Sequence, residues 1–195
     1  DTGRMRARGG LSTTAAHGLD ALSQADAIRI PGWRDAETPP SAALVAALQA
    51  ARARGARLAS ICAGSVVLAF AGFLNGRRAT THWKYAERMR ALFPDVTVDE
   101  RVLYIDHGDI LMSAGSAAGL DMCLHIVRKY QGSVVANGIA RRMVVPPHRD
   151  GGQAQFVTSP LPATRTETLA PLLDWMTENL DSELTIGRLA ARVNM

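Results

Sequence analysis

Short apolar runs alternate with helical repeats along the first part of the chain. Residues 25–33, "ADAIRIPGW", form an apolar run that a Pro-Gly pair stops, which predicts a buried strand leading into a loop. Residues 40–55 predict a helix with a C-terminal glycine, because four apolar side chains share one face: Leu44, Val45, Leu48 and Ala51. A second strand over residues 56–61 and a second helix over residues 63–74 follow. This alternation predicts an α/β fold, with a parallel sheet covered by helices on both faces.

The second half of the chain continues the pattern. Residues 83–93 predict a helix, and residues 96–115 alternate as strands do, with a hairpin turn at residues 106–109. Two further helices are expected over residues 116–132 and 133–145, the second of which runs into a Pro-Pro pair.

The C-terminal part has a different character. Residues 148–166 are rich in glycine, proline and polar residues without periodicity, which predicts a linker or an extended arm. Helical spacing then returns at five apolar positions: Leu169, Leu172, Leu173, Met176 and Leu180. Thr185 predicts the N-cap of a second short helix, whose apolar positions are Ile186, Leu189, Ala190 and Val193. Two short amphipathic helices leave an apolar groove uncovered, so we expect a domain that is present only in part.

Length and composition narrow the class of protein. A chain of 195 residues has room for one domain of ordinary size and the start of another. No apolar run reaches the roughly 18 residues of a membrane span. The N-terminal "DTGRMRARGG" is basic but lacks the hydrophobic region of a secretion signal. We therefore expect a globular protein of the cytoplasm.

The charge adds little on its own. The formal net charge is +4 and the sequence pI is about 9.6, which permits contact with phosphates. Basic residues are scattered along the chain, and an ordinary solvated surface explains them as well.

The two cysteines, Cys62 and Cys123, lie in unlike contexts, so reduced thiols are expected rather than a disulfide. Cys123 shares a predicted apolar helix face with Leu120, Leu124 and Val127, which predicts an inert packing residue. None of the five histidines has ligand-like spacing with either cysteine, so neither a metal nor a cofactor is predicted.

Cys62 stands where the second strand is predicted to turn into the second helix. A side chain on such an elbow lies at the carboxyl edge of the sheet, where open α/β folds bind ligands. The backbone N–H groups of Ala63, Gly64 and Ser65 would point near the sulfur, and the helix N-terminus would favour its thiolate. The same amides could hold an oxyanion. This geometry predicts reactivity.

Catalysis by Cys62 would also need a base within hydrogen-bond reach. His82, in "ATTHW", is the histidine that a neighbouring strand end could bring to the site, and a structural histidine would fit there equally well. Ser113, Gly115 and Ser116 lie at the next junction of strand and helix. They could line the same pocket, or simply cap the helix that follows.

Three segments together carry a resemblance to a known family: "SICAGSVVLAFAGFLNGRRATTHW", "LYIDHGDILMSAGSAAGLDMCLHIVR" and "ARRMVVPPHRDGGQAQF". They resemble the PfpI-like, class I glutamine-amidotransferase-like sensor domain of AraC-family transcriptional regulators of the GlxA, FtrA and AdpA type. The resemblance covers nearly the whole chain. It implies a flavodoxin-like, doubly wound sensor domain, often dimeric, followed by a C-terminal DNA-binding domain with two helix-turn-helix units.

The resemblance also implies a division of the chain. Residues 1–157 correspond to the sensor domain, residues 158–166 to a linker, and residues 167–195 to the start of the AraC/XylS DNA-binding domain. The recognition helix that enters the major groove is expected to follow Met195, so this chain alone is not expected to read DNA. Relatives carry an opening strand, helix and strand before the segment that begins at Arg6, and we expect these to be missing here. In enzymes of the superfamily an acidic residue after the first strand contacts the cysteine.

These observations leave two classes of function open for the protein, and two simpler roles open for Cys62. The first is a transcriptional regulator that acts as a homodimer, binds DNA through its full-length C-terminal domain, and binds an unknown small molecule at Cys62, Ala63, Gly64, Ser65, His82, Gly115 and Ser116. The second is a cysteine hydrolase, a deglycase-like enzyme or an isonitrile hydratase, with Cys62 as nucleophile and either His82 or the missing acidic residue moving protons. Hydratase relatives tend to have threonine where this chain has Ala63. Cys62 could instead be a redox sensor, or an inherited small residue at a tight turn.

Overall fold

The computed structural model describes residues 4–6, 10–155, 170–181 and 184–193 of the chain. The chain divides into two compact units, Asp1–Phe156 and Val157–Met195. The first unit contains the sheet and the candidate site.

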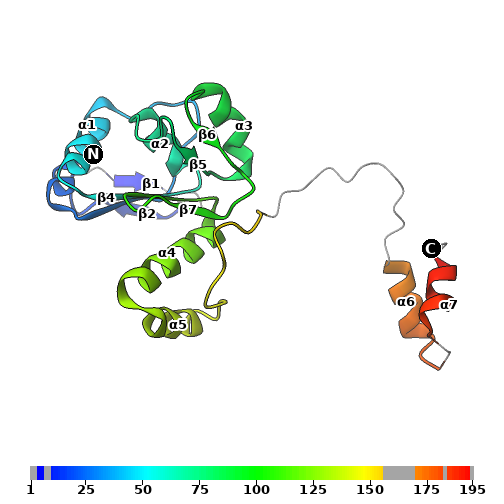
Figure 1. Cartoon of the computed structure of the whole chain (residues 1–195). Coiled ribbons are helices and arrows are strands. Elements are labelled where there is room, and N and C mark those ends of the chain that lie inside the picture. The colour runs from blue at the N-terminus through cyan, green and yellow to red at the C-terminus, as the bar shows by residue number, and fades with distance from the viewer. Residues whose placement is uncertain (1–3, 7–9, 156–169, 182–183, 194–195) are drawn as a thin grey trace. The chain divides into compact units, whose positions relative to one another are not determined.

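A four-stranded sheet forms the centre of the first unit (Figure 1). Its strands follow the spatial order β3 (Ala27–Ile30), β4 (Arg57–Ile61), β8 (Ile110–Ser113) and β7 (Tyr104–Asp106). β3, β4 and β8 are parallel, as the alternation of strand and helix predicts. β7 is antiparallel to β8, because the predicted hairpin turn joins the two strands directly. The α/β, flavodoxin-like prediction is confirmed, with one antiparallel strand at the sheet's edge.

Helices cover both faces of this sheet (Figure 1). On one face lie α1 (Ala42–Ala53), α2 (Gly64–Phe70) and α3 (Trp83–Leu92), and on the other lie α4 (Ser116–Gln131) and α5 (Ser133–Arg142). Smaller elements complete the unit: the antiparallel pair β1 (Arg4–Arg6) and β2 (Ser12–Thr14), the 3-10 helix η1 (Leu19–Gln24), and the parallel pair β5 (Arg78–Ala79) and β6 (Thr97–Val98).

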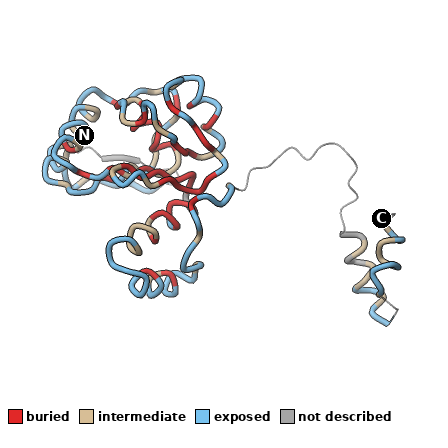
Figure 2. The backbone as a smooth tube through the Cα atoms, in the orientation of Figure 1, coloured by how far each residue is buried: buried red, intermediate tan, exposed pale blue. Residues whose placement is uncertain are grey.

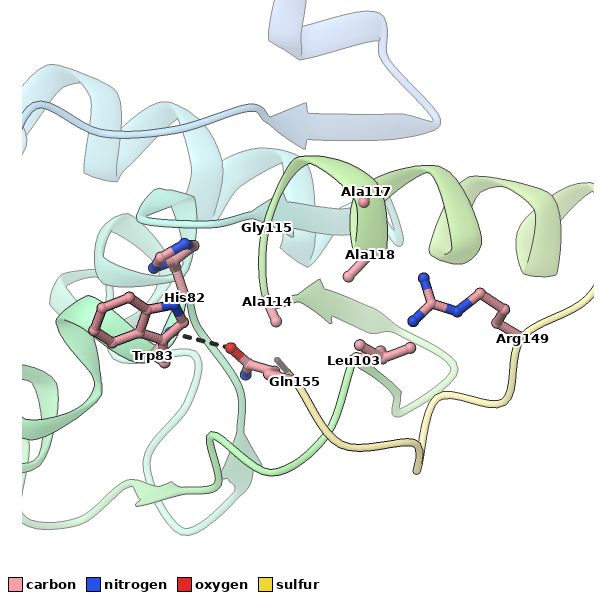
Figure 3. A pocket seen from close by; sticks show the side chains of 9 residues that line it. All are labelled: His82, Trp83, Leu103, Ala114, Gly115, Ala117, Ala118, Arg149 and Gln155. Carbon is pink, nitrogen blue, oxygen red and sulfur yellow. Dashed lines mark hydrogen bonds between the residues drawn. The ribbon is translucent and has the colours of Figure 1, made fainter. Parts of the chain in front are cut away.

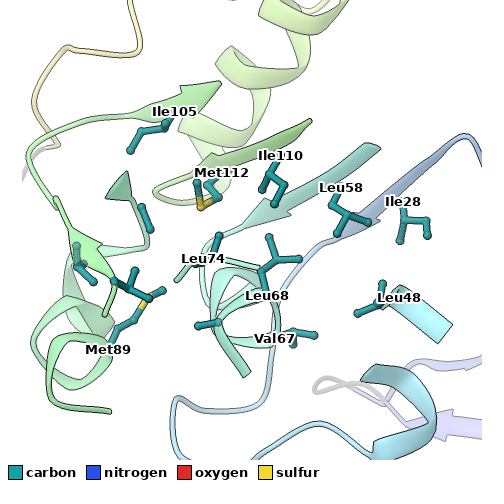
Figure 4. Close-up of a cluster of buried hydrophobic side chains, with 14 of the residues drawn as sticks. Ile28, Leu48, Leu58, Val67, Leu68, Leu74, Met89, Ile105, Ile110 and Met112 are labelled. Carbon is teal, nitrogen blue, oxygen red and sulfur yellow. The ribbon is translucent and has the colours of Figure 1, made fainter. Parts of the chain in front are cut away.

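Alternation along the strands divides the core into two layers. Ile28, Leu58, Ile110 and Met112 point toward α1 and α2, where they form the larger buried cluster with Leu48, Val67 and Leu68 (Figure 4). The intervening residues face α4, and the smaller cluster there includes Tyr104, Leu111, Ala118 and Met122. The buried residues accordingly lie mainly in the sheet and in the helix faces that cover it (Figure 2).

The predicted apolar face of α4 is right at Leu124, which is 5% exposed, and wrong at Leu120. Ala118, Met122 and Ile126 pack toward the sheet at a spacing of four residues, whereas Leu120 is 42% exposed. Each helical residue advances by about 100°, so Leu120 lies on the side of α4 away from Ala118. Cys123 is only partly buried, and its sulfur accepts a hydrogen bond from Arg29 Nη1 at 3.4 Å. Cys123 is therefore not a residue of the apolar core.

The helix expected over residues 63–74 is shorter than predicted. α2 ends at Phe70, and Gly72 adopts a left-handed φ of 79° in the turns that follow. Leu74 is nevertheless fully buried, so the apolar pattern continues beyond the helix.

Helix α5 ends on a left-handed residue that is not glycine. Val144 has a φ of 55°, and the N–H groups of Val144 and Val145 donate to Arg141 O and Ala140 O, the bonds of a Schellman cap. Its side chain is 91% exposed, so it gains no packing in return for the strain. We expect Val144→Gly to raise the free energy of unfolding by about 1 kcal/mol in denaturant titrations. Val144→Ala keeps a Cβ and should gain less, and a loss of stability in the glycine variant would contradict this explanation.

Asp106 ties β7 to α4. Its Oδ2 accepts from His125 Nε2 and Lys129 Nζ, both at 2.8 Å. Although burial raises the pKa of Asp106, these bonds outweigh it and lower the pKa to about 2. The stabilisation is therefore complete above the ordinary pKa of 3.8 and is lost as the pH falls toward 2. We expect Asp106→Asn to cost about 2 kcal/mol at pH 7, and stability measured across pH should show this difference vanish in acid.

The second unit contains two short helices. α6 (Ala170–Glu178) and α7 (Ile186–Arg192) are joined by the Arg192 guanidinium, which lies 4.0 Å from the Trp175 ring centroid. Thr185 is the N-cap of α7, as predicted, although its side chain makes no capping bond. Leu169 and the predicted linker, residues 158–166, lie outside the described residues.

Candidate functional site

The turn at Cys62 lies at the carboxyl end of β4, between the ends of β3 and β8. Cys62 has a φ of 55°, a left-handed value that costs a non-glycine residue about 1–2 kcal/mol. Its N–H donates to Ser113 O at 2.9 Å, which fastens the turn to the end of β8. Its side chain is partly exposed. The predicted elbow is therefore present, at the sheet edge where open α/β folds bind ligands.

Buried hydroxyl groups hold this elbow in its strained conformation. Ser65 Oγ and Thr81 Oγ1 donate to Cys62 O at 3.1 and 3.0 Å, and both residues are fully buried. The Ser65 N–H also points to Cys62 O, at 3.4 Å. This corrects the expectation that the Ser65 amide is free to face the sulfur, since it closes the turn instead.

Gly64 begins α2 directly against the end of β3. A Cβ at Gly64 would overlap Ile30 O and lie 3.1 Å from the carbonyl carbon of Ile30. Only glycine permits this approach of helix and strand, so Gly64 sets the position of the elbow.

His82 is the N-cap of α3. Its Nδ1 accepts from the Lys84 N–H at 3.2 Å. Burial, together with the charge of Lys84, lowers the pKa of His82, so the ring is neutral near pH 7. In the neutral ring with Nδ1 as acceptor, Nε2 carries the proton. His82 therefore presents a hydrogen-bond donor, and this tautomer cannot take a proton from Cys62.

A pocket of about 300 Å³ opens beside His82 (Figure 3). His82 and Trp83 line one side and Arg149 the opposite side, with small apolar side chains between them: Leu103, Ala114, Ala117 and Ala118. Gly115 lies against the imidazole, because a Cβ there would be 3.1 Å from His82 Cδ2. Of the seven predicted ligand-binding residues, His82 and Gly115 line this pocket. Cys62, Ala63, Gly64 and Ser65 form the elbow and are not among its lining residues.

At the next junction, Ser113 differs from expectation. Ser113 ends β8, where its Oγ is buried and donates to Ser60 O at 3.4 Å, so it caps no helix. Gly115 is the N-cap of α4 and has no side chain to contribute. Ser116 begins α4, and its side chain lies outside what the structure describes.

Sequence reasoning missed the contribution of residues 146–155, which we call the arm. Gln155 joins the arm to the body: its Oε1 accepts from the Trp83 N–H, and its Nε2 donates to Thr81 O and Val102 O, each at 3.1 Å (Figure 3 shows the first of these bonds). Residues 148–155 were expected to be a linker or an arm, and the structure shows an arm. The segment "VVPPHRDGGQAQF" could have indicated the arm, but nothing in its local sequence identifies the residues that the arm contacts.

Two further contacts hold the middle of the arm. Gly151 O accepts from the Leu103 N–H at 2.7 Å, and a Cβ at Gly151 would lie 2.6 Å from Tyr104 O. Arg149 Nη1 pairs with Asp121 Oδ2 at 3.1 Å, and burial raises the pKa of Asp121 despite this partner. The arm is therefore packed against β7 and α4 along its length.

The described residues contain no group of three or more His, Cys, Asp or Glu side chains that could hold a metal ion. None of the helices described is both long and apolar enough to cross a bilayer.

Comparison with known proteins identifies relatives of two kinds. The sequence model of the DJ-1/PfpI family matches residues 1–129. The chain is 29% identical over 198 residues to the HTH-type transcriptional regulator CdhR of Pseudomonas aeruginosa, covering 100% of this chain and 58% of that regulator. It is 32% identical over 149 residues to isonitrile hydratase of Pseudomonas putida, covering 75% of this chain and 60% of the enzyme. The chain thus spans little more than half of the curated regulator.

Solved structures share the fold. An AraC family transcriptional regulator from Pseudomonas putida superposes with a TM-score of 0.62 at 22% identity, covering 73% of this chain and 77% of that one. Drosophila melanogaster DJ-1beta superposes with a TM-score of 0.61 at 18% identity, covering 74% of this chain and 78% of that one.

Proposed function

The chain belongs to the DJ-1/PfpI family, and from this premise we propose that it is the sensor part of a DNA-binding transcriptional regulator. The observation that carries the proposal is the extent of the alignments. The regulator CdhR aligns with 100% of the chain, whereas isonitrile hydratase aligns with 75% of it. A second helical unit after the sensor has a use in a regulator and none in a hydratase.

In this proposal residues 1–157 sense a ligand, residues 158–166 are a linker, and residues 167–195 open the AraC-type DNA-binding domain. The helix pair α6 and α7 supports this division, since helix-turn-helix units begin with short packed helices. The complete protein would act on chromosomal DNA in the cytoplasm as a homodimer. A small effector would bias the dimer between two arrangements of its DNA-binding domains.

Catalysis by Cys62 is the second candidate, favoured by the similarity to isonitrile hydratase. Two observations weigh against it. The Cys62 thiol has no hydrogen-bond partner among the described residues, and His82 presents Nε2–H rather than a free lone pair. Purified protein is expected to consume a small aliphatic isonitrile no faster than its Cys62→Ala variant does. Turnover that depends on Cys62 would favour the enzyme instead.

The regulator is tested by restoring transcription in cells. A strain lacking the gene is complemented with the complete gene, with the gene stopped after the codon for Met195 of this chain, or with the complete Cys62→Ala gene. We expect the complete gene and its Cys62→Ala form to restore the same transcripts, and the shortened gene to restore none. An unchanged transcript profile on deletion would contradict the proposal.

A further inference from the structure

The pocket beside His82 is built from parts that are far apart in sequence. The body contributes the beginning of α3, with His82 and Trp83, and the beginning of α4 (Figure 3). The arm contributes Arg149 and Gln155. Its volume of about 300 Å³ is at the lower end of the range for small-molecule sites, about 300–1,000 Å³. The pocket therefore suits a ligand of few atoms.

The polar groups that remain free in this pocket are hydrogen-bond donors. Arg149 Nη1 is held by Asp121 and its Nε by Gln153 Oε1 at 3.3 Å, while Nη2 has no partner among the described residues. The side chain is 24% exposed, and its guanidinium is turned toward Ala118 (Figure 3). His82 adds Nε2–H. The amide of Gln155 is already used by backbone groups of the body.

The charge of the lining residues also favours an anionic ligand. Arg149 is its one charged side chain, and no carboxylate belongs to it among the residues the structure describes. The N-terminus of the 16-residue helix α4 faces the pocket through Gly115 and Ala117, and its dipole favours negative charge there. Between the donors the walls are apolar. Asp121, the carboxylate paired with Arg149, is not among the lining residues, so a cation in the pocket would meet the guanidinium. An anion with a small apolar body would meet both the guanidinium and the apolar walls.

We propose that this pocket binds a small aliphatic carboxylate, with its carboxylate on Arg149 Nη2 and its carbon chain against Leu103, Ala114 and Ala118, toward His82. Arginine suits this role because a guanidinium forms strong, directed bonds to carboxylates. Asp121 acts as a positioning residue, because its bond to Nη1 holds the guanidinium toward the pocket.

The proposal rests on the proposed function in naming this carboxylate as the effector. The ligand would touch the body and the arm together, and would therefore stabilise the docked arm. The arm leads into residue 157, where the second unit begins. Three amides report arm docking directly, because their partners are arm atoms: Trp83 N–H on Gln155 Oε1, and Leu103 N–H and Tyr104 N–H on Gly151 O.

The test measures how acetate, butyrate and hexanoate bind to the complete protein. Each carboxylate is compared with its primary amide and with the corresponding amine. Calorimetry measures the affinity, and amide hydrogen exchange measures arm docking. We expect at least one carboxylate to bind about tenfold or more tightly than its amide, with no binding of the amines. The bound carboxylate should slow exchange at Trp83, Leu103 and Tyr104. Equal affinity for the amides, tighter binding of an amine, or no binding by any carboxylate would overturn the proposal.

Variants locate the site. Arg149→Gln is expected to abolish the preference for carboxylate, and Arg149→Lys, which keeps the charge and so the pairing with Asp121, should weaken it while the fold is retained. Arg142→Gln removes an exposed arginine of α5 outside this pocket and should change nothing. A carboxylate preference that survives both Arg149 variants would contradict the assignment. If no carboxylate binds but the complete protein still binds DNA, the carboxylate proposal is wrong and the regulator proposal is retained. If a carboxylate binds but the complete protein does not bind DNA, the regulator proposal is wrong and the carboxylate site is retained.

Discussion

Replacing Gly64 with alanine is expected to lower the free energy of unfolding by about 3 kcal/mol. The added methyl group would overlap Ile30 O, a backbone atom that cannot rotate away as a side chain can. Relief requires β3 and α2 to move apart, which opens the larger buried cluster. Chemical denaturation monitored by circular dichroism measures the loss.

Gly32 provides the matched control. It lies two residues beyond β3, and a Cβ there would meet nothing within 4 Å. Gly32→Ala is therefore expected to change stability by less than about 1 kcal/mol. Similar losses in both variants would mean that the contact of Gly64 with Ile30 is not what holds the elbow in place.

Replacing Gln155 with glutamate is expected to release the arm. The glutamine Nε2 donates to Thr81 O and Val102 O, and a carboxylate oxygen in its place would face two carbonyl oxygens. We expect a local loss of about 2–3 kcal/mol, because the change removes two bonds and adds repulsion. Exchange of the Trp83, Leu103 and Tyr104 amides should accelerate by about 30-fold or more.

The same substitution two residues earlier should have the opposite outcome. Gln153 uses only its Oε1, which accepts from Arg149 Nε, and glutamate preserves that acceptor and adds charge. Gln153→Glu is expected to leave amide exchange in the docked region unchanged or slower. If both variants release the arm, added negative charge rather than the bonds of Gln155 is responsible.

The sheet could be predicted because its signals are local. Apolar periodicity within about ten residues predicts the strands and helices, and the turn residues 106–109 predict the hairpin. The face of α4 could not be predicted this way. Leu120 and Met122 are both apolar, and only the packing of the helix on β7 and β8 decides that Met122 is buried and Leu120 exposed.

In the candidate site, too, local features could be predicted from the sequence and long-range contacts could not. The elbow at Cys62 was predictable, because it arises where a strand passes into a helix. The helix that begins after His82 was also expected, but the N-cap role of His82 was not. Arg149 and Gln155 were not, because they reach the pocket from more than 60 residues beyond His82. Gln155 also binds backbone atoms, which carry no sequence signal. The arm was indicated by its glycine, proline and polar residues, and one of these glycines, Gly151, permits the chain to touch Tyr104.

Binding of the complete gene product to a pool of chromosomal DNA fragments decides whether this fold serves gene control. We expect the complete protein to enrich a small set of fragments, with an affinity that falls by about a thousandfold or more between 50 and 200 mM salt, as counterion release requires. Residues 1–195 alone should enrich none. A complete protein that retains no fragment above background, even at low salt, would contradict the role in transcription.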